Sequence, residues 1–120
     1  MRDAVNGHGI TINGDGTPLR SYLYVVELVE WLFTLLTKAP NGAIYNVGSS
    51  DEISIRALAD QIVQLGTQSI PVEVKTMTKR ETPPERYIPD VSKISSEMGL
   101  IQKISLSEGL RRFKLWMEER

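Results

Sequence analysis

The stretch that decides the fold is GDGTPLRSYLYVVELVEWLFTLL, which runs from Gly14 to Leu36. Its glycine-rich start predicts a tight turn, and Pro18 restrains the backbone where that turn ends. From Val26 to Thr37 apolar residues cover most sides of a helix, so we expect this helix to be largely buried. Between the turn and the helix stands Arg20, a charged residue on a rigid support. What Arg20 binds is the main functional question that the sequence raises.

The bulk composition limits the classes of function. The chain has 120 residues, of which 41% are hydrophobic and 24% charged, and its formal net charge is −1. These values indicate a single domain over 1–120 with no field that would attract nucleic acid. The absence of cysteine excludes a disulfide framework, and the single histidine, His8, supplies a metal site poorly, so we expect no metal. Without a signal sequence or a spanning apolar run, we expect a cytoplasmic protein that does not contact a membrane.

Hydrophobic periodicity predicts a mixed α/β fold with short strands and about four helices. The expected strands cover 10–12, 43–47 and the region around 72–75. Besides the helix from Val26 to Thr37, we expect helices that begin near Ser54, Asp90 and Ser105, where capping residues stand.

Two ligand-binding loops can be excluded from residue spacing. A dinucleotide loop of the form G-x-G-x-x-G would need glycine where Ile12 or Leu19 stands. A calcium loop would need glycine where Pro18 stands and glutamate where Tyr24 stands.

Arg20 has two interpretations that the residues alone do not separate. A guanidinium on a restrained turn suits bidentate capture of a phosphate or carboxylate. The alternative is a structural ion pair with Glu27 or with another carboxylate of the chain.

Five segments, in this order and at these distances, carry a family resemblance: GDGTPLRSYLYV, YNVGS, ISIRALA, RYIPDVSK and SLSEGLRRF. With them the chain resembles the C-terminal part of NAD-dependent sugar-nucleotide epimerases and dehydratases, such as dTDP-glucose 4,6-dehydratases, in the extended short-chain dehydrogenase superfamily. The resemblance implies a Rossmann domain that binds NAD, followed by a smaller region that binds the sugar nucleotide. This chain is similar to the second region alone, with the Rossmann domain absent.

The family's catalytic pair, Tyr-x-x-x-Lys, has no counterpart here. The residues four positions after the four tyrosines are Val26, Leu28, Ser49 and Val91. The resemblance therefore implies no catalytic residue and no cofactor site in this chain, with NAD held elsewhere in the intact enzyme.

The resemblance also assigns binding residues. It implies that Arg20 and Arg80 contact the diphosphate of a nucleoside-diphosphate hexose, and that Asn13 lies at the base, where relatives often carry a stacking aromatic. Glu27 occupies a position that is usually aspartate, so we expect a less firmly set helix start there.

We therefore expect the sugar-nucleotide-binding portion of a lyase or isomerase, inactive alone, whose partner is the missing Rossmann domain. The family mechanism is oxidation of the sugar by NAD, then elimination or epimerisation, then return of the hydride. The apolar helix from Val26 to Thr37 would be exposed in the separated piece and could support a homo-oligomer. The alternative function is a stand-alone nucleotide-sugar sensor or oligomerisation module without catalysis.

Overall fold

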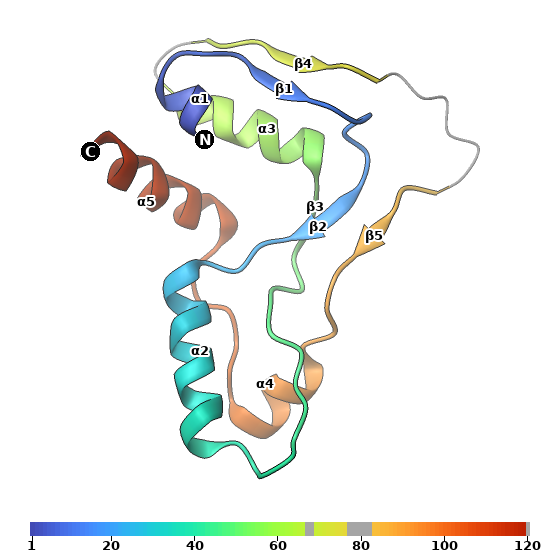
Figure 1. The fold of residues 1–120 in the computed structure, drawn as a ribbon, viewed down its shortest axis with the longest axis vertical. Helices are drawn as coiled ribbons and strands as arrows, with labels where there is room; N and C mark the ends of the chain where they lie inside the picture. Colours follow the sequence, from blue (N-terminus) through green and yellow to red (C-terminus); the bar gives the residue numbers. More distant parts are fainter. Residues whose placement is uncertain (67–68, 77–82, 120) are drawn as a thin grey trace.

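The computed structural model describes residues 1–66, 69–76 and 83–119, which form helices and short strands of mixed order (Figure 1). In chain order the elements are α1 (Arg2–Val5), β1 (Ile10–Ile12), β2 (Leu19–Ser21), α2 (Val25–Lys38), β3 (Glu52–Ser54), α3 (Ile55–Gln64), β4 (Val72–Val74), β5 (Arg86–Tyr87), α4 (Ser92–Met98) and α5 (Leu106–Glu118). The expected mixed α/β class is confirmed, and the one-turn helix α1 was missed. No helix in these ranges is long and apolar enough to cross a membrane.

The strands form two small sheets. β1 pairs with β4 in parallel, and Ile10 lies opposite Val72. β2 is the centre of the other sheet, antiparallel to β3 and parallel to β5. Within that sheet Arg20 lies between Ile53 and Tyr87. The arginine therefore stands on the best-supported strand of the structure.

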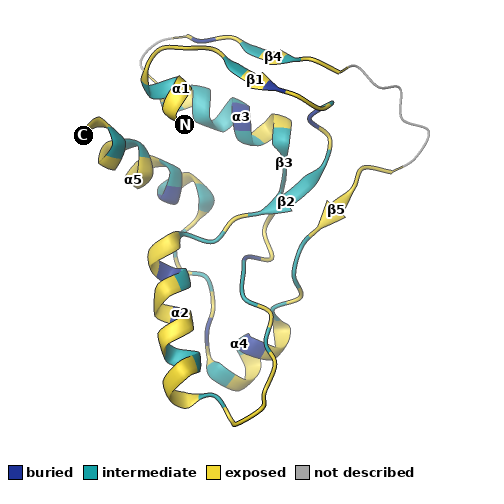
Figure 2. Cartoon of the chain, viewed as in Figure 1, coloured by how far each residue is buried: buried dark blue, intermediate teal, exposed yellow. Residues whose placement is uncertain are grey.

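The core lies between α2, α4 and the segment before α5. Trp31, Ile94 and Leu100 are buried there, and Leu35 of α2 packs against them. The opposite side of α2 is exposed to solvent (Figure 2). We call this side the outer face of α2; its residues are Val25, Val26, Val29, Leu32, Phe33 and Leu36. The sequence predicted the helix itself, and the expectation that its apolar residues would be exposed in this chain is confirmed for this face.

The segment 43–47 also departs from expectation. We predicted a strand there, and the structure shows an extended chain that joins neither sheet. Tyr45 and Val47 nevertheless pack against the core. The side chains thus behave as in a strand, while the backbone finds no neighbouring strand among the described residues.

The helix boundaries follow the predicted signals with one shift. The Ser54 hydroxyl accepts a hydrogen bond from the Ala57 amide at 3.1 Å and caps α3, and the Ser105 hydroxyl caps α5 in the same way. α4 begins one residue later than an Asp90 cap would place it, with Val91 at the N-cap position. The Asp90 carboxylate still accepts a hydrogen bond from the Ser92 amide at 2.9 Å.

The molecule is flat for its size. It extends 48 × 44 × 17 Å along its principal axes, and its radius of gyration is 16.9 Å. A compact chain of this length has a radius of gyration of about 14 Å. The accessible surface is 8364 Å², against about 6,500 Å² for a compact monomer of this mass. About 1,900 Å² of surface is therefore exposed beyond what a self-contained domain of this mass exposes.

Glu27 does not cap α2, whose start has no side-chain cap bond, and instead joins the helix to another segment. Its side chain is buried, and its carboxylate accepts hydrogen bonds from the backbone amides of Lys103 at 2.6 Å and Ile104 at 3.2 Å. These bonds join α2 to the segment that leads into α5. A buried carboxylate is stable when amide donors surround it in this way.

We expect Glu27→Ala to lower the free energy of unfolding by about 2–3 kcal/mol, because two amides would lose a charged acceptor. Glu30→Ala is the matched control, since Glu30 makes only an exposed ion pair with Lys103 at 3.7 Å. Its loss should cost less than about 1 kcal/mol. Urea unfolding of both variants measures the difference, and equal effects would contradict the role given to Glu27.

Candidate functional site around Arg20

A rigid turn precedes the strand that carries Arg20. The Asp15 carboxylate accepts hydrogen bonds from the Thr17 amide at 3.0 Å and the Thr17 hydroxyl at 2.8 Å. Gly16 adopts a φ of +77°, which side chains disfavour. Its carbonyl accepts a hydrogen bond from the Arg56 amide at 2.9 Å, in the first turn of α3. The turn is thus closed by its own side chains and fixed to a helix.

Arg20 itself is half-buried and oriented from two sides. Its Nη1 donates to the Leu19 carbonyl at 2.8 Å, and its Nη2 lies 3.0 Å from the Glu85 carboxylate. The Arg20 side chain is 29% exposed and that of Glu85 is 66% exposed. The structural ion pair that we considered therefore exists, but its partner is Glu85. Glu27, which we named as a possible partner, is bound to backbone amides instead.

Two hollows of the surface meet at Arg20. One is a cavity of about 630 Å³ whose wall includes Arg20, Asn46, Gly48, Tyr87 and Asp90. The other, of about 380 Å³, is lined by Arg20 and Asn13 together with the Gly14–Gly16 turn and the start of α3. A single guanidinium that borders both hollows could hold a linear ligand that extends from one to the other.

The predicted site residues are brought together in part. Asn13 and Arg20 line the same hollow. One ligand could therefore contact both residues. Arg80 lies outside the described residues, so its assignment to the diphosphate stays a prediction.

The sequence reasoning did not assign Glu85, Tyr87 or Asp90 to a site. Glu85 pairs with Arg20, and Tyr87, which is strongly exposed, lines the larger cavity together with Asp90. Hydrogen bonds from Ser92, first from its side chain and then from its amide, hold the pKa of Asp90 below its usual range. Because β2 and β5 are distant in sequence, only the pairing of these strands reveals that these residues are neighbours of Arg20.

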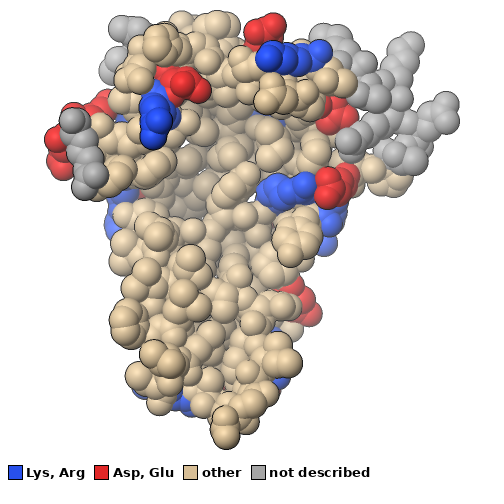
Figure 3. Space-filling view, viewed as in Figure 1, with Lys and Arg blue, Asp and Glu red and all other residues tan. Residues whose placement is uncertain are grey.

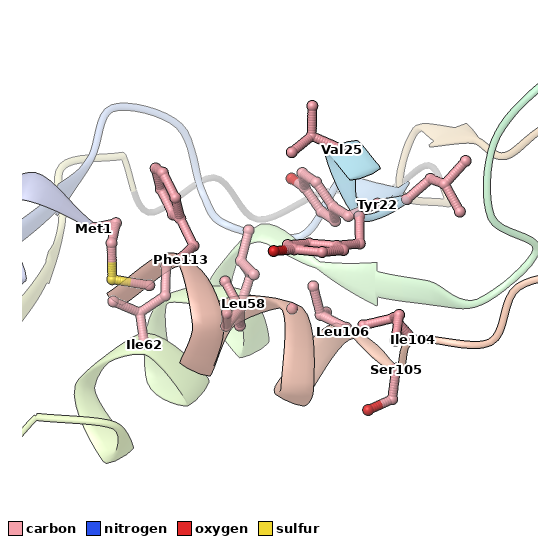
Figure 4. A pocket seen from close by; sticks show the side chains of 13 residues that line it. Met1, Tyr22, Val25, Leu58, Ile62, Ile104, Ser105, Leu106 and Phe113 are labelled. Atoms are coloured by element: carbon pink, nitrogen blue, oxygen red, sulfur yellow. The ribbon is translucent and has the colours of Figure 1, made fainter. Parts of the chain in front are cut away.

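A third hollow is of a different character. This pocket of about 370 Å³ lies between α3, α5 and the segment that joins β2 to α2 (Figure 4). Tyr22 and Tyr24 both line it, with Leu58, Ile62 and Phe113 among the other lining residues. Its lining is almost wholly apolar, so it does not suit a diphosphate.

The described residues contain neither a metal-ligating cluster nor, after β1, a glycine turn of the dinucleotide-binding kind. No cluster of three or more His, Cys, Asp or Glu residues that could hold a metal ion occurs within 1–66, 69–76 and 83–119. A dinucleotide needs a glycine turn that opens a helix N-terminus toward the pyrophosphate. Here the glycine turn after β1 leads into strand β2, and its carbonyls already accept bonds from the first turn of α3.

We expect Gly16→Ala to destabilise the chain by about 1–3 kcal/mol, because the new side chain would require a strained φ. Its Cβ would also lie 3.0 Å from the Cβ of Arg56. Gly14→Ala is the matched control, since a Cβ there meets nothing within 4 Å. Thermal unfolding of both variants measures the effect, and a neutral Gly16→Ala would show that the turn is not rigid.

The comparisons with known proteins agree on one family. A family model described as GDP-mannose 4,6 dehydratase matches residues 2–113. UDP-glucuronic acid decarboxylase 1 of Arabidopsis thaliana is 34% identical over 112 residues, which are 93% of this chain and 25% of that protein. The chain thus spans about a quarter of the length of this relative.

Solved structures show the same fold. The UDP-glucose 4-epimerase of Thermotoga maritima, solved with UDP-glucose, superposes with a TM-score of 0.85 at 22% identity, over 98% of this chain and 37% of the epimerase. A dTDP-glucose 4,6-dehydratase of Bacillus anthracis, solved with NAD, superposes with a TM-score of 0.81 at 24% identity, over 99% of this chain and 37% of that chain.

Proposed function

The chain belongs to the GDP-mannose 4,6-dehydratase family of NAD-dependent sugar-nucleotide epimerases and dehydratases, and on that premise we propose that it is the family's nucleoside-diphosphate-sugar-binding portion. The observation that carries the proposal is the position of Arg20. It is half-buried on the central strand of a sheet, at the edge of two hollows, with one exposed carboxylate as its charged partner.

The contacts of Arg20 suit a diphosphate. The bond to the Leu19 carbonyl restrains the guanidinium next to its own strand. The Glu85 side chain is mostly exposed, so the ion pair contributes little, about 1 kcal/mol or less. A diphosphate carries about two negative charges and several acceptor oxygens, and can accept two parallel bonds from one arginine. We therefore expect a diphosphate to displace Glu85.

The chemical step belongs to the part of the enzyme outside this chain. No tyrosine here has a lysine four positions later, and the glycine turn after β1 is not of the dinucleotide-binding kind. Binding the diphosphate, which does not react, lets the enzyme use that binding energy to position the sugar.

We expect the chain alone to turn over no nucleotide sugar. Incubation with NAD and UDP-glucose, followed by chromatography of the sugars, measures this, and any turnover would contradict the assignment of a binding portion. A stand-alone sensor would also be inactive, but it would fold without a second lobe.

We expect Arg20→Ala to weaken binding of UDP by about 10- to 100-fold, since a hydrogen bond to a charged group contributes about 1.5–3 kcal/mol. Glu85→Gln should strengthen binding by up to about fivefold, because it removes a competing anion. Calorimetric titration measures both effects. Arg56→Ala is the control, because Arg56 forms its own ion pair with Asp60 at 3.1 Å and its loss changes the net charge equally.

The three variants together show whether Arg20 and Glu85 take part in binding UDP. If Arg20→Ala and Arg56→Ala bind UDP equally well, Arg20 is not part of the site. If Glu85→Gln binds more weakly than the wild type, Glu85 is a ligand-binding residue and does not compete with the diphosphate.

A further inference from the structure

We propose that the pocket of about 370 Å³ between α3, α5 and the segment from β2 to α2 is a second ligand site, and that its ligand is a monocarboxylate with an apolar body, such as a medium-chain fatty acid. The apolar body lies in the pocket, and the carboxylate binds the guanidinium of Arg112 at the rim. This site is separate from the hollows at Arg20 and does not rest on the proposed function.

The pocket has the size and the lining of a site for a small apolar molecule. Its volume lies in the lower part of the range of about 300–1,000 Å³ that small-molecule sites occupy. Leu106, Leu110 and Phe113 of α5 line it and follow the 4-3 spacing of one helix stripe. In Figure 4 the side chains of Tyr22, Leu58 and Phe113 come from three different segments and surround one space. No charged side chain of the described residues is part of this lining.

Tyr24 connects the apolar pocket with a charged group. Its ring lines the pocket and packs on Gly109 of α5, where an added Cβ would lie only 3.3 Å from Cδ2 of Tyr24. The Cζ atom of Arg112, one turn further along α5, lies 5.8 Å from the centre of the same ring. A cation next to an aromatic face in this way is itself a favourable contact. The guanidinium is therefore held beside a residue of the pocket wall.

Arg112 also has donors left for a carboxylate. Its Nε donates to the Glu108 carboxylate at 2.6 Å, and the same carboxylate accepts two bonds from Arg111, at 2.8 and 2.9 Å. Hydrogen bonds from Arg111 and then from Arg112 lower the pKa of Glu108 to about 2, so this carboxylate is ionised at neutral pH. Two guanidinium groups thus share one negative charge. Within the described residues the Nη groups of Arg112 donate no hydrogen bond, and their fork suits a second carboxylate.

The surroundings of the pocket favour a ligand with one charged end. Figure 3 shows that the charged side chains of this face lie mainly in its upper part, where Figure 1 places α3 and α5. A wholly apolar ligand would leave the donors of Arg112 unused. A diphosphate would bring charge against the apolar lining, which costs free energy. A monocarboxylate with an apolar body fits both the lining and the guanidinium.

The test titrates the chain with octanoate and observes the methyl groups of Leu58 and Ile62, which line the pocket, by NMR. We expect octanoate to shift both sets of signals. Hexanoate and butyrate should bind successively more weakly, by about threefold for each methylene removed, because each methylene in the pocket is withdrawn from water.

Two variants separate a contact with Arg112 from a general effect of charge. Arg112→Gln and Arg111→Gln each remove one positive charge next to Glu108, but it is Arg112 that lies over the ring of Tyr24. We expect Arg112→Gln to weaken octanoate binding by about fivefold, and Arg111→Gln to change it by less than about twofold. Binding of 1-octanol, which has no charge, should be equal in both variants and the wild type.

Three results would overturn the proposal. The first is that octanoate leaves the signals of Leu58 and Ile62 unchanged. The second is that affinity does not rise from butyrate to octanoate, since the apolar pocket would then not hold the chain of the acid. The third is that both arginine variants lose octanoate equally. Arg20→Ala should bind octanoate as the wild type does, and UDP binding is measured separately, so this site and the proposed function can fail independently.

Discussion

The structure depends on a helix with two apolar sides and only one layer to cover them. Trp31 and Leu35 hold α2 to the core, while the outer face of α2 meets solvent. Burial of apolar area contributes about 25 cal/mol per Å², so an uncovered face of this kind is a strong drive toward association. The flat shape and the large accessible surface accompany this uncovered face.

The turn and the strands around Arg20 are held by several contacts within the chain. Gly16 and Asp15 close the turn before β2, strands β3 and β5 flank Arg20, and Glu27 connects α2 with the segment before α5. None of these contacts involves the outer face of α2. The geometry around Arg20 is therefore set by contacts within this chain.

The sequence predicted elements where local signals decide the structure. The caps at Ser54 and Ser105 and the strand 10–12 follow from residue chemistry over a few positions, and the structure confirms them. The strand at 43–47 was predicted from the same kind of pattern and was wrong, because a strand needs a neighbour and none is supplied by the described residues. The residue pattern shows that a segment can form a strand. Whether it does so depends on a neighbouring strand with which it can pair.

The sequence also predicted the candidate site in part. Arg20 and Asn13 were named from motif positions, and the structure brings both to one hollow. Glu85 was not named, because its contact with Arg20 depends on the pairing of β2 with β5 across more than sixty positions. Glu27 was named only for its place at the helix start, where the structure has no side-chain cap. Its bonds to amides of another segment were not predicted, because no local rule for helix starts includes them.

A crystal structure of the chain with bound UDP would test the central claim most directly. We expect the diphosphate oxygens within hydrogen-bonding distance of the Arg20 guanidinium, with the Glu85 carboxylate moved away and the bond from Arg20 to the Leu19 carbonyl retained. A diphosphate bound elsewhere, with the ion pair between Arg20 and Glu85 intact, would contradict the assignment of this cleft.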